Sequence, residues 1–190
     1  MKKLNDVRQL LLDAPVIAAV KDDRALQRAL DSECQVIFLL YGTILNLQGL
    51  VEQIHSRGKL CFIHLDLVEG LSSREIAVEA AQRIFQPDGI ISTKLPLIRR
   101  AQQLGLLAIQ RVFLLDSMSL STLLGQLDTV HPDFIEVLPG ILPDIIREIT
   151  EKTQIPLIAG GLIRGKQDVF QALQAGVVAV STSSQAVWEM

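Results

Sequence analysis

Charged side chains follow several short apolar runs of the sequence, at places where parallel strands would end. Asp66, Lys94, Arg111 and Glu136 belong to four different runs. His64 shares the strand face of Asp66, because alternate residues of a strand point the same way. Two acidic and two basic groups that meet at one edge of a sheet can neutralise one another, bind a polar ligand or transfer protons. The alternative is an ion-pair network that binds nothing.

The last two apolar runs are followed by residues that are typical of a phosphate site. Gly160 and Gly161 follow one run, and Ser181, Thr182 and Ser183 end the next. Glycine lets backbone N–H groups approach an anion, hydroxyl groups donate to it, and a following short helix would add partial positive charge. The pattern predicts a phosphate-binding site, with ordinary turn chemistry as the alternative.

Eight such apolar runs recur about 23 residues apart, which leaves room for a strand, a helix of about three turns and two short loops. The runs are 15–20, 36–40, 60–65, 89–92, 106–110, 134–138, 156–160 and 177–181. Amphipathic segments separate them, and several of these end in glycine. The segments are 24–31, 47–56, 73–85, 97–104, 119–130, 143–150 and 166–173, and a last turn starts at Ser184.

Alternation of strands and helices requires parallel strands with crossover helices, and eight such units close a barrel. We therefore expect residues 1–190 to form one compact (β/α)8 barrel of the TIM type. Its functional face would be the carboxyl ends of the strands, where Lys21 also lies. The alternative is an open doubly wound sheet, which usually has five or six strands and a glycine-rich first turn. In this chain that turn is Lys21-Asp22-Asp23.

The composition excludes several classes of protein. Apolar residues make up 49% of the chain and charged residues 21%, as in folded domains rather than disordered chains. The longest apolar stretch, 36–47, is interrupted and short for a membrane span, and no export signal is visible. We therefore expect a cytoplasmic protein with no membrane partner. Cys34 and Cys61 fit neither a disulfide framework nor a zinc site, so we expect both to be buried, with no metal and no cofactor.

Six segments resemble, in order and over nearly the whole chain, the glycerol-3-phosphate-responsive antiterminator family, the regulators of glycerol uptake operons. They are FIHLDLVEGLS (62–72), DGIISTK (88–94), AIQRVFLLDS (108–117), PDFIEVLPG (132–140), PLIAGGLI (156–163) and AVSTS (179–183), followed by Trp188. The resemblance implies a bacterial cytoplasmic protein that binds glycerol 3-phosphate as its effector. It would then bind the leader mRNA of glycerol-utilisation genes and let RNA polymerase read through a terminator.

The resemblance also implies roles for the residues singled out above. The phosphate would contact the two small-residue turns, with Lys94 and Arg111 as charge partners. The residues of those turns are Gly160, Gly161, Ser181, Thr182 and Ser183. The glycerol hydroxyls would face hydrogen-bond acceptors, namely Asp66 and Glu136, with His64 and Glu69 in support. No residue is assigned a catalytic role.

The RNA site is less visible in the sequence. The formal net charge is −3, only 4% of the residues are aromatic, and no common RNA-recognition motif is present. Arg164 and Lys166 are candidates, because they follow the predicted phosphate turn. We expect Trp188 to pack against the last helix rather than to stack on a base. The effector would have to favour an RNA-competent state, through an ordered loop or a homodimer.

Two other functions compete with this interpretation. Phosphosugar isomerases and lyases place lysine and carboxylates around a phosphate site on the same fold, which would make Lys94 an acid or Schiff base and Asp66 or Glu136 a general base. A barrel with a purely structural role is the third candidate, although it would have little use for polar groups gathered on one face. Turnover of the ligand distinguishes the enzyme from the regulator.

Overall fold

The computed structural model describes residues 4–127 and 129–190. Eight parallel strands follow one another in chain order around a closed barrel, in which β1 pairs with both β2 and β8. This closure confirms the predicted (β/α)8 barrel and excludes the open sheet. The strands are β1 (Val16–Val20), β2 (Val36–Leu39), β3 (Leu60–His64), β4 (Gly89–Ser92), β5 (Leu107–Phe113), β6 (Phe134–Leu138), β7 (Leu157–Gly160) and β8 (Ala179–Thr182).

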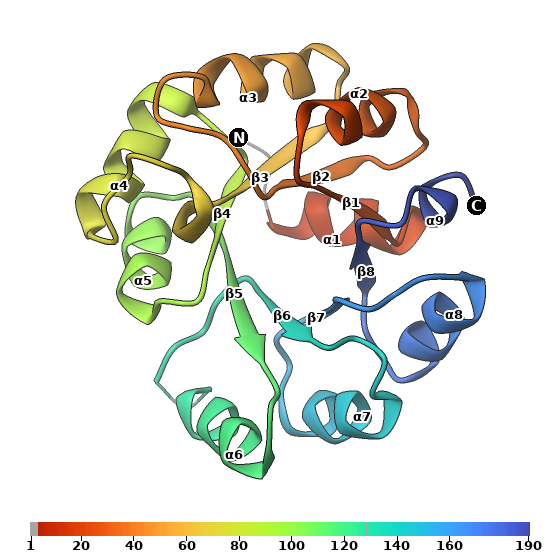
Figure 1. Cartoon of the computed structure of the whole chain (residues 1–190). Helices are drawn as coiled ribbons and strands as arrows, with labels where there is room; N and C mark the ends of the chain where they lie inside the picture. The colour runs from red at the N-terminus through yellow and green to blue at the C-terminus, as the bar shows by residue number, and fades with distance from the viewer. Residues whose placement is uncertain (1–3, 128) are drawn as a thin grey trace.

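Helices form an outer ring around the strands (Figure 1). Two of them begin at an aspartate that accepts a hydrogen bond from the first turn, Asp22 before α2 and Asp116 before α6. The helices of the ring are α2 (Asp23–Asp31), α3 (Leu47–Ser56), α4 (Glu75–Ala80), α5 (Leu95–Gln103), α6 (Ser117–Gln126), α7 (Pro143–Lys152), α8 (Lys166–Gln174) and α9 (Gln185–Trp188). A 3-10 turn, η1 (Leu65–Leu67), follows β3, and a π-helical turn, η2 (Ala81–Phe85), extends α4.

Strand β5 is longer than the sequence predicts. We expected it to end at Gln110, whereas it continues through Arg111 to Phe113. A charged residue can lie within this strand because Arg111 is directly beside Glu136 of β6 in the strand register. Its charge is therefore compensated inside the barrel, which an apolar run cannot reveal.

The barrel interior is filled by alternate residues of the strands. Phe38, Phe62 and Phe134 are fully or almost fully buried there, and the rings of Phe38 and Phe62 meet edge to face with centroids 5.9 Å apart. Gly89 makes room for this packing, because a Cβ at its position would lie 2.5 Å from the Phe62 ring. The other face of each strand packs against the helices. Side chains thus fill the middle of the barrel and leave its carboxyl end for polar groups.

A helix that the sequence analysis did not predict precedes the first strand. Helix α1 (Leu4–Asp13) places Val7 and Leu11 in the same apolar cluster as the barrel interior, so it closes the amino-terminal end of the barrel (Figure 1). The signal was present in the apolar residues at positions 7, 10 and 11, which share one helical face. Across the described ranges, no helix combines the length and the apolar character that a bilayer crossing requires.

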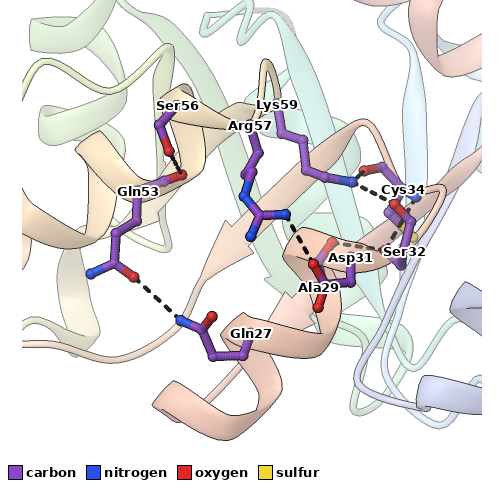
Figure 2. Close-up of polar contacts among 9 residues, drawn as sticks. All are labelled: Gln27, Ala29, Asp31, Ser32, Cys34, Gln53, Ser56, Arg57 and Lys59. Atoms are coloured by element: carbon purple, nitrogen blue, oxygen red, sulfur yellow. Dashed lines mark hydrogen bonds and ion pairs between the residues drawn. The ribbon is translucent and has the colours of Figure 1, made fainter.

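The amino-terminal end of the barrel holds a buried cation. Lys59, which precedes β3, is only 7% exposed, and its Nζ donates to the carbonyl oxygens of Ser32 and Cys34, both at 2.6 Å (Figure 2). Burial lowers the pKa of Lys59 and raises the pKa of the Cys34 thiol. Cys34 and Cys61 are both free and buried, as expected. These contacts tie β3 to the loop before β2, on the face opposite the polar groups.

Candidate functional site

A cavity of about 640 Å³ opens at the carboxyl ends of β5, β6, β7, β8 and β1. Its walls combine apolar side chains, such as Phe113 and Leu138, with hydroxyl groups and charges. The lining consists of Ala19, Lys21, Leu40, Arg111, Phe113, Leu115, Glu136, Leu138, Pro139, Gly161, Leu162, Ile163, Arg164, Ser181, Thr182, Ser183 and Ser184. Such a site suits a small ligand with one charged and one less polar end.

Three buried side chains that are hydrogen-bonded to one another belong to this lining. Arg111 of β5 donates from Nε to Oε2 of Glu136 at 2.6 Å, and Ser181 of β8 donates from Oγ to Oε1 of the same carboxylate at 2.5 Å. Glu136 is fully buried and Arg111 is 7% exposed. Both carboxylate oxygens are therefore engaged, and the positive charge of Arg111 is compensated. The predicted phosphate residue Ser181 and the predicted glycerol residue Glu136 thus form one unit.

The two glycines after β7 have different structural roles. A Cβ on Gly160 would lie 2.6 Å from Oε1 of Glu136 and 2.7 Å from Oγ of Ser181, so only glycine leaves room for that contact. Gly161 lines the cavity with a φ of 74°, and Leu162 follows with a φ of 62°. A left-handed conformation is costly for leucine, and such strain collects at functional sites. The turn after β7 therefore has an unusual, left-handed backbone conformation where it lines the cavity.

The residues after β8 divide between the cavity and the scaffold. Oγ1 of Thr182 donates to the carbonyl oxygen of Ile163 at 2.7 Å and accepts from the N–H of Ser184, so this hydroxyl fixes the two loops to each other. Ser183 is exposed in the lining. Trp188 is buried, and its Nε1 donates to the carbonyl oxygen of Thr182 at 2.8 Å. It therefore anchors α9, as expected, and offers no stacking surface.

Asp66 and Lys94 lie apart from the cavity, in a second polar group at the ends of β3 and β4. Asp66 accepts 2.8 Å hydrogen bonds from Oγ of Ser92 and from both N–H and Oγ1 of Thr93. Burial by itself raises the pKa of Asp66, but these hydrogen bonds outweigh it and lower the pKa. Lys94, the residue before α5, donates to Ser73. Neither side chain lines the cavity, so of the four predicted charges the cavity lining holds Arg111 and Glu136.

His64 lies between the two groups, on the inner face of β3. It is 3% exposed, and among the described atoms its Nδ1 has no hydrogen-bond partner. Burial, and then the charge of Arg111, lower its pKa to about 4, so the ring is neutral at physiological pH. Glu69 is exposed in the loop after η1, where its backbone bridges to Thr43. Neither of these two predicted glycerol residues lines the cavity.

Basic side chains surround the opening. Arg164, which was predicted to contact RNA, lines the cavity itself, and Lys166 begins α8 two residues later. Lys21 also lines the cavity, although the sequence analysis gave it no role beyond its place at a strand end. The alternation of side chains along β1 could have indicated this position, because Lys21 follows Ile17 and Ala19 on the inward face of the strand. Within the described part of the chain, no group of three His, Cys, Asp or Glu side chains could hold a metal ion.

The fold and this cavity define a (β/α)8-barrel protein with a charged site at the carboxyl ends of its strands. The family model of the glycerol-3-phosphate responsive antiterminators matches residues 16–188. The chain therefore belongs to that family, as its sequence motifs indicated.

Relatives cover almost the whole chain. It is 45% identical over 181 residues to the uncharacterized protein YgcP of Escherichia coli (strain K12), with 95% of each chain covered. The glycerol uptake operon antiterminator regulatory protein of Listeria monocytogenes superposes with a TM-score of 0.90 at 35% identity, covering 93% of this chain and 95% of its own. A glycerol uptake operon antiterminator-related protein of Thermotoga maritima superposes with a TM-score of 0.83 at 34% sequence identity. The match covers 92% of this chain and 98% of the Thermotoga chain.

Proposed function

We propose that this protein binds glycerol 3-phosphate at the carboxyl-terminal mouth of its barrel and, when loaded, binds the leader mRNA of glycerol-utilisation genes to prevent termination of transcription. The family supports a regulator of this kind, and two solved relatives are named as antiterminator proteins of glycerol uptake operons or as related to them. A regulator that reads mRNA acts in the cytoplasm. This function needs no cofactor, since the effector is the ligand.

The arrangement of Arg111, Glu136 and Ser181 beside the turn at Gly161 is the observation that carries the effector half of the proposal. Arg111 uses Nε to bind Glu136, and the guanidinium has further N–H donors that can bind phosphate oxygens. Ser183 and the backbone of the turn at Gly161 supply uncharged donors beside it. The phosphate would therefore lie between the ends of β5, β7 and β8.

The glycerol hydroxyl groups would then face Glu136. It is the carboxylate in the lining, and a carboxylate has about four lone-pair sites, of which two are used by Arg111 and Ser181. Asp66, His64 and Glu69 were expected to help, but their positions outside the lining make Glu136 the better acceptor. The apolar wall of Phe113 and Leu138 would cover the carbon chain.

The same geometry favours a regulator over a phosphosugar isomerase or lyase. Lys94, which such an enzyme would use as acid or Schiff base, bonds to Ser73 outside the cavity. Of its two candidate bases, Glu136 is held by two hydrogen bonds, and Asp66 accepts three and does not line the cavity. A protein with this arrangement should return glycerol 3-phosphate unchanged.

Titration of the purified protein with glycerol 3-phosphate, followed by calorimetry and by phosphorus NMR over hours, tests the effector half. We expect saturable binding of an unchanged ligand, with glycerol alone and inorganic phosphate binding more weakly. Arg111→Lys is a suitable variant, because it keeps the charge and removes the planar fork of donors. Conversion of the ligand to another phosphate ester would show that the protein is an enzyme rather than a regulator. An absence of binding would contradict the proposed effector.

The RNA half needs a separate test. Gel-shift titrations with the leader RNA of a glycerol-utilisation gene should show tighter binding when glycerol 3-phosphate is present. Lys166→Gln should weaken binding of the loaded protein to RNA and leave effector affinity unchanged, because Lys166 is exposed outside the cavity. RNA affinity that does not depend on the effector would contradict the proposed regulation.

A further inference from the structure

We propose that Lys21 is a ligand-binding residue and that, together with Arg164, it selects a doubly charged phosphate monoester over singly charged anions. This inference rests on the proposed function and adds to it the charge state that the site recognises. Among the described residues, the cavity lining contains three basic side chains, Lys21, Arg111 and Arg164, and one acidic side chain, Glu136, so these residues carry a formal net charge of +2.

The excess charge does not come from Arg111. That guanidinium lies 2.6 Å from the fully buried carboxylate of Glu136, so the two form a neutral pair. Lys21 and Arg164 are exposed, and in the ranges 4–127 and 129–190 neither side chain takes part in an ion pair. Two unpaired cations at one opening repel each other, and an anion placed between them removes this repulsion.

No nearby carboxylate forms an ion pair with Lys21 among the described residues. Asp22 accepts the N–H of Ala25 at 2.8 Å and so caps α2, while Asp23 accepts the hydroxyl of Tyr41 at 2.7 Å. On the other side of the opening, Asp168 accepts the backbone N–H groups of Arg164 and Gly165. Each of these carboxylates thus accepts a hydrogen bond from an uncharged donor, and none forms an ion pair with Lys21 or Arg164 in the described ranges, so the two basic side chains remain available to a ligand.

A dianion matches the net charge of the cavity, whereas a carboxylate or a phosphodiester leaves one positive charge without a partner. A phosphate monoester loses its second proton with a pKa of about 6, so it is mainly a dianion at neutral pH. Affinity should therefore fall as the pH drops through this range. It should also fall with rising salt, since both cations are exposed.

The test compares four proteins by calorimetry at pH 7.5: the wild type, Lys21→Met, Arg164→Gln and the control Arg24→Gln. Arg24 is exposed in the first turn of α2, close to Lys21 in the chain and outside the lining. The probes are glycerol 3-phosphate, its singly charged methyl diester and inorganic phosphate. We expect the wild type to prefer glycerol 3-phosphate to the diester by tenfold or more. Lys21→Met and Arg164→Gln should each weaken dianion binding roughly tenfold and reduce this preference, while Arg24→Gln should do neither.

The outcomes separate this inference from the proposed function. If inorganic phosphate binds and depends on Lys21 but glycerol 3-phosphate does not bind, the charge selection stands and the proposed effector is wrong. If glycerol 3-phosphate binds equally well to the wild type and to Lys21→Met, the inference is wrong and the proposed function stands. An equal loss in Arg24→Gln would show general electrostatic attraction and would also overturn the inference. If no probe binds the wild type, both fail.

Discussion

Nε of Arg111 and Oε2 of Glu136 lie 2.6 Å apart in the interior of the barrel, with the carboxylate fully buried. The two residues are direct neighbours in the register of β5 and β6. Ser181 reaches the other carboxylate oxygen from β8. Three strands that are distant in sequence thus share one charged contact beneath the candidate ligand site.

Removal of both members of this pair should cost less stability than the two single removals added together. Arg111→Met or Glu136→Gln leaves a buried group without its partner, and we expect each to lower the free energy of unfolding by about 3–5 kcal/mol. The double variant should lose clearly less than the sum of the two. Urea unfolding followed by circular dichroism measures this, and additive losses would show that the pair is not coupled.

Gly160→Ala should disrupt the contact between Glu136 and Ser181. The added methyl group would overlap Oε1 of Glu136 and Oγ of Ser181, so we expect a loss of about 1–3 kcal/mol in stability and weaker effector binding. Gly49→Ala is the matched control, because a Cβ there meets nothing within 4 Å. That change should leave stability equal or higher. Full effector affinity in Gly160→Ala would contradict the assigned role of this glycine.

Lys94 should matter little for the effector. Its side chain bonds to Ser73 outside the cavity, so Lys94→Met should change the affinity for glycerol 3-phosphate by no more than about twofold. Arg111→Lys in the same calorimetric assay should weaken binding much more. A large effect of Lys94→Met would restore the single ring of charges that the sequence suggested.

His64 should make the protein sensitive to acid. Its pKa of about 4 in the folded state is below the ordinary value of 6.5, so between these values the unfolded chain binds more protons than the folded one. Stability is therefore complete above about pH 6.5 and falls as the pH drops to about 4, by roughly 2–3 kcal/mol. The lowered pKa of Asp66 adds a loss only at still lower pH.

Unfolding of the wild type and of His64→Gln at pH 7 and pH 4.5 measures this contribution. The wild type should lose more stability than the variant between the two conditions. Equal losses would show that other groups account for the acid sensitivity.

Lys59 should affect stability without affecting the ligand. Its ammonium group bonds to two carbonyl oxygens at the amino-terminal end of the barrel, and Lys59→Met would leave both without this donor. We expect a loss of about 1–3 kcal/mol in the free energy of unfolding, with effector affinity unchanged at a temperature where the variant is folded. A change in affinity would indicate that the two ends of the barrel communicate.

The barrel and its elements follow from the pattern of residues along the chain. Eight apolar runs at regular spacing leave few alternatives once parallel pairing and crossover helices are required, so most strand and helix bounds were predicted within a few residues. Burial of Cys34, Cys61 and Trp188 followed from their types and their places in the chain. Helix α1 was missed because its apolar face is short, although Val7 and Leu11 show the helical spacing.

The grouping of the polar side chains into sites depends on how the chain folds in three dimensions. From their positions in the sequence, Asp66, Lys94, Arg111 and Glu136 were expected at the same end of the barrel. The alternation of side chains along a strand does not predict which of them contact one another around the barrel. The loops determine these contacts. The 3-10 turn after β3 places Asp66 against Thr93, and the start of α5 places Lys94 against Ser73.

Arg111 joined the site because β5 extends beyond its apolar run to meet Glu136. Lys21 joined it because closure of the barrel places the first strand beside the last. Both contacts depend on the register between paired strands, because a slip of one residue would turn these side chains to the other face of the sheet.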